Sequence, residues 1–416
     1  MKKLYVLGGG TISHVRNHLA LCAPAFGSTG RRLFDLCYER FRDINLNLNL
    51  TKMADFTSDM VTNADVASRI HELVSDLDTK VIFFNVALCD WTGEIAISMD
   101  KNEDKVVSGK YAERLKTSDG FKMMLLSPAE KIIRGIRKTR KDIFVVGFKT
   151  TCGATEKEQY LAGLDLLKKS SLNLVLANDT RTRVNMIITP EEAKYHVTKD
   201  REVALAQLVD MTWYRSQLSF TKSTVVDGTL VGWLSEEVPA TLRVIVDYCI
   251  NRNAYKVFNG ATVGHFAAKV SPTEFLTSIR KTNFNKLNEI GLVRIRTDSP
   301  DTVLAYGAKP SVGGQSQRIV FEEHPEYDCI VHFHCPLRKP NLFGIPVISQ
   351  REYECGSHQC GQNTSKGLQR FGNLSAVYLE NHGPNIVFHH SIDASEVIKF
   401  IENNFDLQDK TGGLVE

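Results

Sequence analysis

The chain has 416 residues, 43% of them hydrophobic and 24% charged, which is an ordinary composition for a soluble globular protein of about two or three domains. Its formal net charge is only +3, so composition gives no electrostatic reason to expect nucleic acid or a membrane surface as a partner. The nine cysteines are scattered, and no apolar run approaches the roughly 18 residues that a membrane span requires. Since the sequence also shows no signal-peptide pattern, these features predict a cytoplasmic protein with free thiols.

Two glycine-rich turns stand near the start of the chain. The apolar run 3–7 predicts a buried strand, and residues 8–11 (Gly-Gly-Gly-Thr) follow it directly. Residues 27–32 (Gly-Ser-Thr-Gly-Arg-Arg) form a second turn before an amphipathic stretch. Glycines let backbone amides approach a phosphate, and arginines pair with it, so the two turns favour a polyphosphate site. The alternative is a pair of ordinary tight turns, since the first does not match the dinucleotide-binding pattern G-x-G-x-x-G.

Strands and helices alternate through the N-terminal half. Apolar runs at 81–87, 143–148 and 174–177 predict strands that end in polar residues or glycine. Helical periodicity is expected over residues 62–77, 127–140, 155–170 and 199–211. This alternation predicts an α/β domain with a doubly wound parallel sheet, whose ligands bind at the carboxyl ends of the strands.

The order of short motifs in this half resembles the phosphopantothenate–cysteine ligase (phosphopantothenoylcysteine synthetase) family over residues 1–212. The matching segments are Gly9-Gly10-Thr11, His14-Val15-Arg16, Ser28-Thr29-Gly30, Val86-Ala87-Leu88-Cys89-Asp90, Arg114-Leu115-Lys116, Gly147-Phe148-Lys149 and Ala177-Asn178-Asp179. The resemblance implies a Rossmann-like fold and a ligation driven by a nucleoside triphosphate, CTP or ATP, with magnesium. In such a reaction a carboxylate forms an acyl-nucleotide, which an amine then attacks.

The resemblance also implies site residues for this ligase-like domain. Lys116 is the candidate catalytic residue, although a solvated loop lysine is the alternative. The implied nucleotide-binding residues are Gly9, Gly10, Thr11, Arg16, Ser28, Gly30, Arg31, Asp90, Lys116 and Asn178. Two departures leave the carboxylate and amine substrates open: an insertion that includes residues 19–24, and the replacement, around Phe26-Gly27, of the family's asparagine.

A linker is expected over residues 213–236, between domains 1–212 and 237–416. The turn Asp227-Gly228 lies within it, and a new helical pattern begins after Pro239. The segment is short, which indicates that the two domains are held close together.

The C-terminal half contains a pair of histidines at the end of an apolar run. Residues 329–331 predict a strand that ends in His332-Phe333-His334, and strand alternation places both imidazoles on one face. Glu380-Asn381-His382-Gly383 follows a second apolar run and offers a third histidine. Three histidines with an open position form a typical catalytic metal site, which we expect to hold zinc. The alternative for the pair alone is a polar strand end with solvated histidines.

These segments resemble the class II aldolase/adducin family over residues 238–405. The strand that ends at His334 is similar to the family's metal-binding strand, and the segment before His382 is similar to the strand that supplies its third histidine. The resemblance implies an α/β/α domain around a mainly antiparallel sheet, a divalent metal and lyase chemistry. It also implies a substrate-phosphate site, with Gly264, His265 and Ser278 as candidates.

The acid that the family uses for proton transfer is absent from its expected place, where this chain has Gly313. Chemistry through an enolate needs a base near the metal, so another carboxylate must supply it if the domain is an enzyme. Glu323, beside Glu322, is the candidate acid in the sequence, although either may face solvent.

The sequence therefore predicts a bifunctional metabolic enzyme, with a ligase-like domain fused to a metal-dependent aldolase, epimerase or lyase-like domain for small phosphorylated or sugar-like substrates. The alternative is a non-catalytic or regulatory protein that keeps both ligand-binding folds, which the replaced acid and asparagine favour. The two resemblances also imply a homo-oligomer, either a dimer or a tetramer.

Overall fold

A computed structural model describes residues 1–95, 108–299, 302–311 and 314–411. The chain forms two compact units, one made of Met1–Ile188 and His196–Ser216, the other of Thr189–Tyr195 and Gln217–Glu416. Among the described residues, no helix is both long and apolar enough to cross a bilayer.

Unit 1 is built around a seven-stranded sheet of order β11-β10-β9-β8-β5-β1-β4. Its strands and those of two small ribbons are β1 (Lys3–Gly10), β2 (Ile12–Arg16), β3 (Leu19–Cys22), β4 (Asn45–Leu50), β5 (Thr79–Ala87), β6 (Trp91–Ile95), β7 (Met124–Pro128), β8 (Phe144–Thr151), β9 (Leu174–Asp179), β10 (Asn185–Ile188) and β11 (Lys194–Thr198). Its helices are α1 (Ser28–Arg40), α2 (Asn63–Ser75), α3 (Ile133–Thr139), α4 (Glu156–Ser170) and α5 (Arg201–Arg215). Five adjacent strands of this sheet are parallel, in the order β4, β1, β5, β8 and β9, which confirms the doubly wound fold expected from the sequence.

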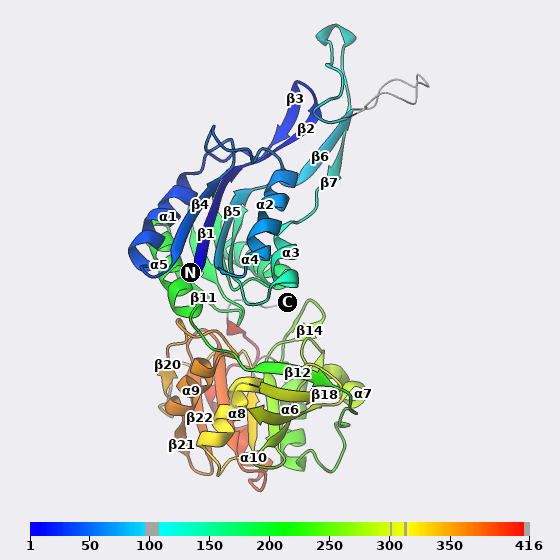
Figure 1. Cartoon of the computed structure of the whole chain (residues 1–416). Coiled ribbons are helices and arrows are strands. Elements are labelled where there is room, and N and C mark those ends of the chain that lie inside the picture. The colour runs from blue at the N-terminus through cyan, green and yellow to red at the C-terminus, as the bar shows by residue number, and fades with distance from the viewer. Residues whose placement is uncertain (96–107, 300–301, 312–313, 412–416) are drawn as a thin grey trace. The chain divides into compact units, whose positions relative to one another are not determined.

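The helices of unit 1 cover both faces of this sheet. Figure 1 shows α1 and α5 on one face and α2, α3 and α4 on the other. Helices α2 and α4 begin at capping boxes, in which Thr62 pairs with Asp65 and Thr155 with Glu158. These caps satisfy backbone N–H groups that lack a partner in the helix, so they fix where each helix leaves the carboxyl edge of the sheet.

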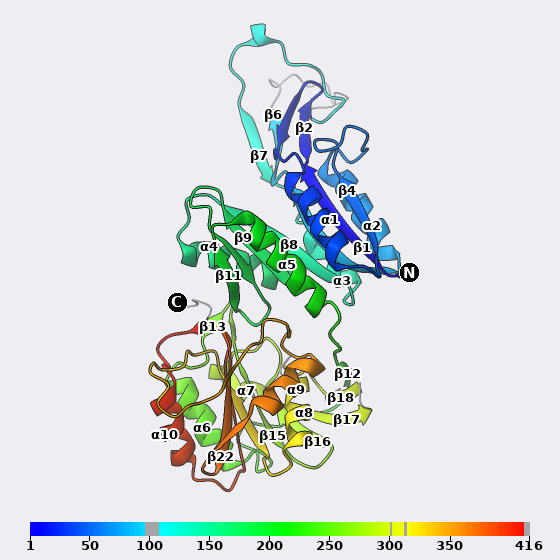
Figure 2. The same ribbon diagram turned by 90° about the vertical axis from the view of Figure 1, so that its left-hand side faces the viewer.

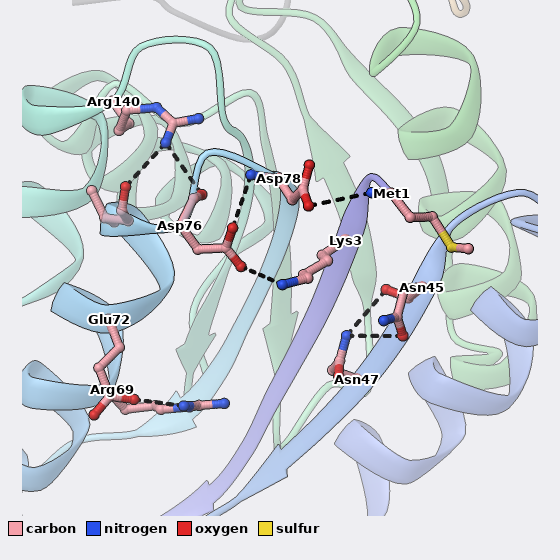
Figure 3. Close-up of polar contacts among 10 residues, drawn as sticks. Met1, Lys3, Asn45, Asn47, Arg69, Glu72, Asp76, Asp78 and Arg140 are labelled. Atoms are coloured by element: carbon pink, nitrogen blue, oxygen red, sulfur yellow. Dashed lines mark hydrogen bonds and ion pairs between the residues drawn. The ribbon is translucent and has the colours of Figure 1, made fainter.

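Polar contacts tie together the amino ends of the strands (Figure 3). Lys3 Nζ lies 2.7 Å from Asp76 Oδ2, and the Met1 amino group lies 3.3 Å from Asp78 Oδ2. The Arg140 guanidinium donates to the carbonyl oxygens of Val74 and Asp76. These contacts lie at the amino ends of the strands, so the carboxyl edge remains as the place for a ligand.

Unit 2 contains a ten-stranded sheet, β12-β18-β17-β16-β15-β19-β23-β22-β20, with β21 paired to β22. Its strands are β12 (Lys222–Val226), β13 (Val257–Phe258), β14 (Ala261–Thr262), β15 (His265–Lys269), β16 (Glu274–Thr277), β17 (Val293–Ser299), β18 (Thr302–Tyr306), β19 (Cys329–His332), β20 (Val347–Ile348), β21 (Gln369–Phe371), β22 (Leu374–Leu379) and β23 (Gly383–Phe388). Its helices are α6 (Ala240–Asn251), α7 (Leu287–Ile290), α8 (Gly314–Glu323), α9 (His358–Gly367) and α10 (Ala394–Asn404). Most pairings are antiparallel, as expected, and among the described strands of this sheet only β12–β18 and β20–β22 are parallel.

Helices lie on both faces of this sheet too, with α6 and α10 on one and α8 and α9 on the other (Figure 2). The core beneath α6 and α10 includes Phe266, Val331 and Phe388, all fully buried. The core on the opposite face includes Ala267, Ile330 and Val387, so β15, β19 and β23 alternate apolar side chains between the faces. A strand buried on both faces provides a rigid base for the histidines at its end.

The boundary between the units differs from the linker expected over 213–236. Helix α5 continues to Arg215, and β12 pairs in parallel with β18. Thr224, Val225 and Val226 are β-branched residues, which suit such an edge strand, and most of the expected linker is part of unit 2. The short segment Thr189–Tyr195, between β10 and β11, also belongs to unit 2.

Candidate functional site

The three predicted histidines meet in unit 2. His332 ends β19, His334 lies two residues beyond it, and His382 lies in the turn between β22 and β23. All three are buried, and one ligand nitrogen from each lies within 4.8 Å of the others. The Nε2 atoms of His332 and His382 are 3.2 Å apart. The structure therefore gathers the donor set that the sequence predicted.

The second nitrogen of each histidine has an acceptor of its own. His332 Nδ1 lies 2.7 Å from the Pro384 carbonyl oxygen, and His382 Nδ1 lies 2.6 Å from Gln350 Oε1. His334 Nδ1 lies 3.1 Å from Glu192 Oε2. When each Nδ1 donates to its acceptor, the proton lies on Nδ1, and Nε2 is the nitrogen that carries the lone pair a metal would bind. This arrangement is typical of metal-binding histidines, so the donor set fits a divalent cation such as zinc.

Burial keeps the site in the form that a metal requires. Burial, with the neighbouring His382, His265 and His334, lowers the pKa of His332 well below its ordinary value. A metal binds only the neutral imidazole, so protons do not compete for this nitrogen at neutral pH.

Gly383 allows the two histidine segments to approach each other. A Cβ at this position would lie 2.1 Å from the Phe333 carbonyl oxygen, between His332 and His334 in the chain. Gly264 has the same role on the other side, since it adopts φ +109° and a Cβ there would lie 2.6 Å from the His332 carbonyl oxygen. These two glycines allow the backbone contacts that bring the histidine rings together.

His265 lies directly beside the three clustered histidines. Its ring stacks on that of His332 with 4.6 Å between centroids, and its Nδ1 contacts Gln317 Nε2. Gln317 Oε1 in turn accepts from Thr277 Oγ1 at 2.9 Å. Burial, together with His334, lowers the pKa of His265 to about 3, so this ring is neutral.

The other two predicted phosphate-site residues frame this histidine. Gly264 precedes it, and Ser278 is fully buried near the end of β16. Within the described part of the chain the Ser278 hydroxyl has no hydrogen-bond partner. The candidates are therefore close to one another, but they form a buried polar patch rather than an open, positively charged phosphate loop.

The carboxylate that the structure brings to the histidines is Glu192. It is 2% exposed and, besides His334, contacts Lys410 Nζ at 3.4 Å. Glu323, the candidate from the sequence, is instead exposed at the C-terminal end of α8. Gln317, near the start of the same helix, is the α8 residue that reaches His265, so Glu323 points away from the site. Gly313 lies outside the described residues.

The sequence analysis did not identify Glu192 or Gln350. Glu192 is 142 residues before His334 in the chain and lies in a short turn without strand or helix periodicity. Gln350 lies just after β20, and no motif marked it. The only available signal was chemical: a metal-binding histidine usually has an acceptor for its second nitrogen.

A second group of metal-donor side chains lies on the surface of unit 2. Asp328, His389 and His390 offer three ligand atoms within 4.8 Å, and both histidines are exposed. Asp328 precedes β19 and His389 follows β23, so this group lies at the opposite ends of the strands that carry His332 and His382. The Asp328 carboxylate already accepts from the backbone N–H and the ring of His390. This surface group serves below as a control for metal binding.

In unit 1 several of the predicted nucleotide residues, among them Gly10, Thr11 and Asn178, lie at the carboxyl edge of the parallel sheet. The parallel strands stand in the sheet in the order β4-β1-β5-β8-β9. The chain adds β4 on one side of β1 and the later strands on the other side, so the direction of strand addition reverses between β1 and β5. Open α/β sheets bind ligands at such a reversal point. The Thr11 hydroxyl is hydrogen-bonded there to Asn63 Oδ1 at 2.7 Å and accepts from the Cys89 N–H at 2.9 Å. Asn63, the first residue of α2, was not identified from the sequence.

The glycines of the two turns pack against each other. A Cβ on Gly8 would lie 3.3 Å from the Gly30 Cα, and a Cβ on Gly10 would lie 2.0 Å from the Ala23 carbonyl oxygen. Gly27, with φ +81°, starts α1 without a side-chain cap. The structure therefore brings the end of β1 and the start of α1 together, as the two motifs suggested.

The remaining predicted residues are more dispersed. Arg16 is buried in the β2–β3 ribbon and donates to the Ile95 carbonyl oxygen at 2.8 Å, which makes it part of the packing. Arg31 donates to the Ala54 carbonyl oxygen at 2.7 Å, and Asp90 forms an ion pair with Lys131. Asn178 accepts from Thr150 at 3.3 Å at the end of β9.

Lys116 lies in an exposed loop before the short 3-10 helix η1 (Thr117–Asp119). Within the described ranges its side chain makes no hydrogen bond or ion pair, so nothing ties it to the glycine turns. Ser28 is the first residue of α1 and is also exposed.

Comparison with known proteins gives matches among solved structures alone. No family model matches the chain, and no curated protein matches it. One matched structure is the DNA/pantothenate metabolism flavoprotein from Streptococcus pneumoniae, 19% identical, with TM-score 0.43, covering 52% of this chain and 100% of that one. Another is the C-terminal domain of the coenzyme A biosynthesis bifunctional protein CoaBC, 11% identical, with TM-score 0.35, covering 50% of this chain and 91% of that one.

A third matched structure is L-fuculose 1-phosphate aldolase, 16% identical, with TM-score 0.31, covering 41% of this chain and 83% of that one. The matches fall into the same two groups as the motif resemblances in the sequence. At these identities the likeness concerns the fold alone.

Proposed function

We propose that unit 2 is a divalent-metal-dependent enzyme of the lyase, aldolase or epimerase type, acting on a small phosphorylated or sugar-like substrate. The observation that supports it most is the convergence of three buried histidines, each with an acceptor for its Nδ1 atom. Bound zinc would polarise a substrate carbonyl and stabilise negative charge that develops on its oxygen.

The side chains around the histidines suit such a substrate. The neutral His265 ring, held by Gln317, offers a hydrogen-bonding nitrogen beside His332. The buried Ser278 hydroxyl adds a polar group in the same region. Because His265 and Ser278 are themselves buried, each polar contact that they make to a substrate would be stronger than in bulk solvent.

Metal analysis tests the first step of this proposal. The purified full-length protein should hold about one tightly bound zinc per chain, retained against a weak chelator. His332→Ala should lose this metal, whereas the control His389→Ala, which changes an exposed histidine of the surface group, should retain it. A protein without tight metal, or equal loss in both variants, would contradict the proposed site.

Turnover separates an enzyme from a binding protein. Hydroxyketones and hydroxy acids, with and without a phosphate, would be incubated with the metal-loaded protein and checked for cleavage, epimerisation or solvent deuterium exchange next to the carbonyl. Activity that His332→Ala abolishes and His389→Ala retains supports the enzyme. Metal binding with no exchange on any substrate would favour the alternative, a regulatory protein that binds ligand without turnover.

For unit 1 we propose nucleotide-dependent ligation of a carboxylate to an amine, with CTP or ATP bound as the magnesium complex at the carboxyl edge of the sheet. The order reversal beside β1 and the packed turns at Gly8 and Gly30 support this. A nucleoside triphosphate should raise the unfolding temperature of unit 1. Arg31→Ala should reduce that shift, whereas Arg42→Ala, an exposed arginine just beyond the far end of α1, should leave it unchanged.

We further infer a homo-oligomer, a dimer or tetramer, from the two resemblances in the sequence. Light scattering of the full-length chain tests it, and a monomer at micromolar concentration would contradict it.

A further inference from the structure

The segment Thr189–Tyr195 places a buried carboxylate against a metal-binding histidine. In the structure this segment belongs to unit 2, although β10 precedes it and β11 begins within it. Its turn is closed by backbone hydrogen bonds between Thr189 and Ala193 and between Glu192 and Thr189. The Glu192 side chain is 2% exposed, so its position is fixed by the surrounding groups.

Glu192 is the one charged acceptor among the three that hold the histidines. His332 and His382 are oriented by neutral oxygens, a backbone carbonyl and the Gln350 amide. His334 Nδ1 instead faces Glu192 Oε2 at 3.1 Å. A carboxylate holds the Nδ1–H more strongly than an amide oxygen does, and it makes the opposite nitrogen a better metal donor.

The charge of Glu192 has a partner on the other side. Lys410 Nζ lies 3.4 Å from the same Oε2, and Lys410 is also buried. A buried carboxylate is costly unless it is paired and hydrogen-bonded, so the lysine and the imidazole together stabilise its ionised form. The carboxylate therefore has the environment of a permanent acceptor.

The backbone at Glu192 adopts φ +67°, the left-handed region that residues with a side chain rarely occupy. This conformation costs free energy, which the backbone hydrogen bonds of the turn and the contacts of the side chain with His334 and Lys410 offset together. A glycine would satisfy the turn with less strain, so the glutamate is best explained by what its side chain does.

We propose that Glu192 is a positioning residue of the metal centre: it fixes the orientation and tautomer of His334, so that the segment Thr189–Tyr195 completes a site whose ligands all come from residues 332–382. This inference rests on the proposed metal site. It assigns to the short turn a part in metal binding that neither the sequence motifs nor the histidines alone indicated.

The test measures zinc affinity of the full-length protein by competition with a chromophoric chelator at fixed pH. Glu192→Ala should bind zinc about 10- to 100-fold more weakly, as expected for loss of a partner behind a metal ligand. Glu192→Gln, which keeps a hydrogen-bond acceptor without the charge, should fall between this variant and wild type. The matched control is Glu323→Gln, an exposed glutamate of unit 2, which should match wild type.

A double-mutant cycle with His334→Ala distinguishes positioning from a general effect on folding. If Glu192 acts through His334, then Glu192→Ala should cost little additional affinity once His334 is removed. The visible spectrum of the cobalt-substituted protein provides a second readout, since a misoriented ligand changes the absorption bands. Both Glu192 variants should alter the bands, and Glu323→Gln should not.

Three results would overturn the inference. Wild-type zinc affinity and cobalt spectrum in both Glu192 variants would show that the carboxylate does not position the metal. Equal losses from Glu192→Ala in the presence and absence of His334 would assign it a purely structural role. If the wild-type protein binds no metal, the proposed function fails together with this inference. The metal analysis of wild type and His332→Ala separates this outcome from the other two.

Discussion

Replacement of Gly383 by alanine tests whether close backbone contact assembles the metal site. The added Cβ would lie 2.1 Å from the Phe333 carbonyl oxygen, whereas real Cβ contacts essentially never fall below 3.0 Å. The backbone must therefore separate by about 0.9 Å at the point where His382 meets the 332–334 segment. Metal–ligand distances tolerate changes of only about 0.2 Å, so the three histidines can no longer bind one ion in their present arrangement.

The expected loss of zinc affinity in Gly383→Ala follows from the same overlap. Forcing an additional carbon into a packed site costs about 3 kcal/mol. If that cost falls on the metal-binding arrangement, zinc affinity drops roughly 100-fold, because each factor of ten corresponds to about 1.4 kcal/mol. Chelator competition on the folded variant measures this drop, and circular dichroism verifies that the variant is folded.

Gly372→Ala provides the matched control for this experiment. Gly372 lies in the turn between β21 and β22 and also has a positive φ, +63°, but its added Cβ meets only the flexible end of Glu396, at 3.3 Å. We expect it to lower stability by about 1 kcal/mol from the backbone conformation, without changing zinc affinity. A Gly383→Ala variant that is folded and binds zinc like wild type would refute the argument that this contact positions His382.

Three further predictions concern unit 1. Gly10→Ala should remove the thermal shift by CTP or ATP, because its Cβ would lie 2.0 Å from the Ala23 carbonyl oxygen and displace the first turn; an unchanged shift would exclude this turn from the nucleotide site. Leu164→Ala, at a fully buried position in α4, should lower the stability of unit 1 by about 2–5 kcal/mol in urea unfolding while zinc affinity stays at the wild-type value. Hydrogen bonds from the Thr182 backbone, and from Ala154, Thr151 and Gly153, hold the pKa of Asp179 well below its usual range. The stabilisation from Asp179 is therefore complete above about pH 4 and is lost as the pH falls toward the folded pKa, so melting temperatures measured from pH 6 to pH 3 should fall less steeply in Asp179→Asn than in wild type.

The parts of this protein that local patterns determine could be predicted from the sequence. Strand alternation predicts that His332 and His334 share one face; β19 ends at His332, and His334, two residues beyond it, still meets His332 in the same group. Alternating strands and helices predicted the doubly wound sheet of unit 1, because a parallel strand needs a crossover helix and each element here follows its own periodicity. The third histidine also follows an apolar run, but no local pattern joins His382 to a strand 50 residues earlier, so its place beside His332 was supported by the family resemblance.

The carboxylate that contacts His334 could not be predicted in this way. A search along the sequence for a carboxylate near the histidines favours neighbours in the chain, which is why Glu323 was the candidate; a helical turn and a half separates it from Gln317, and it faces solvent. Glu192 reaches His334 from a turn whose sequence, residues 189–193 (Thr-Pro-Glu-Glu-Ala), has the composition of an ordinary connection. In the structure the turn differs from an ordinary connection because its glutamate is buried and strained, at φ +67°. Backbone strain and burial are properties of the folded chain and cannot be read from the sequence. Both cost free energy at Glu192, and its contacts with His334 and Lys410 explain why a glutamate stands there. For this reason the affinity of the proposed metal site should depend on a carboxylate that precedes His332 by well over a hundred positions in the chain.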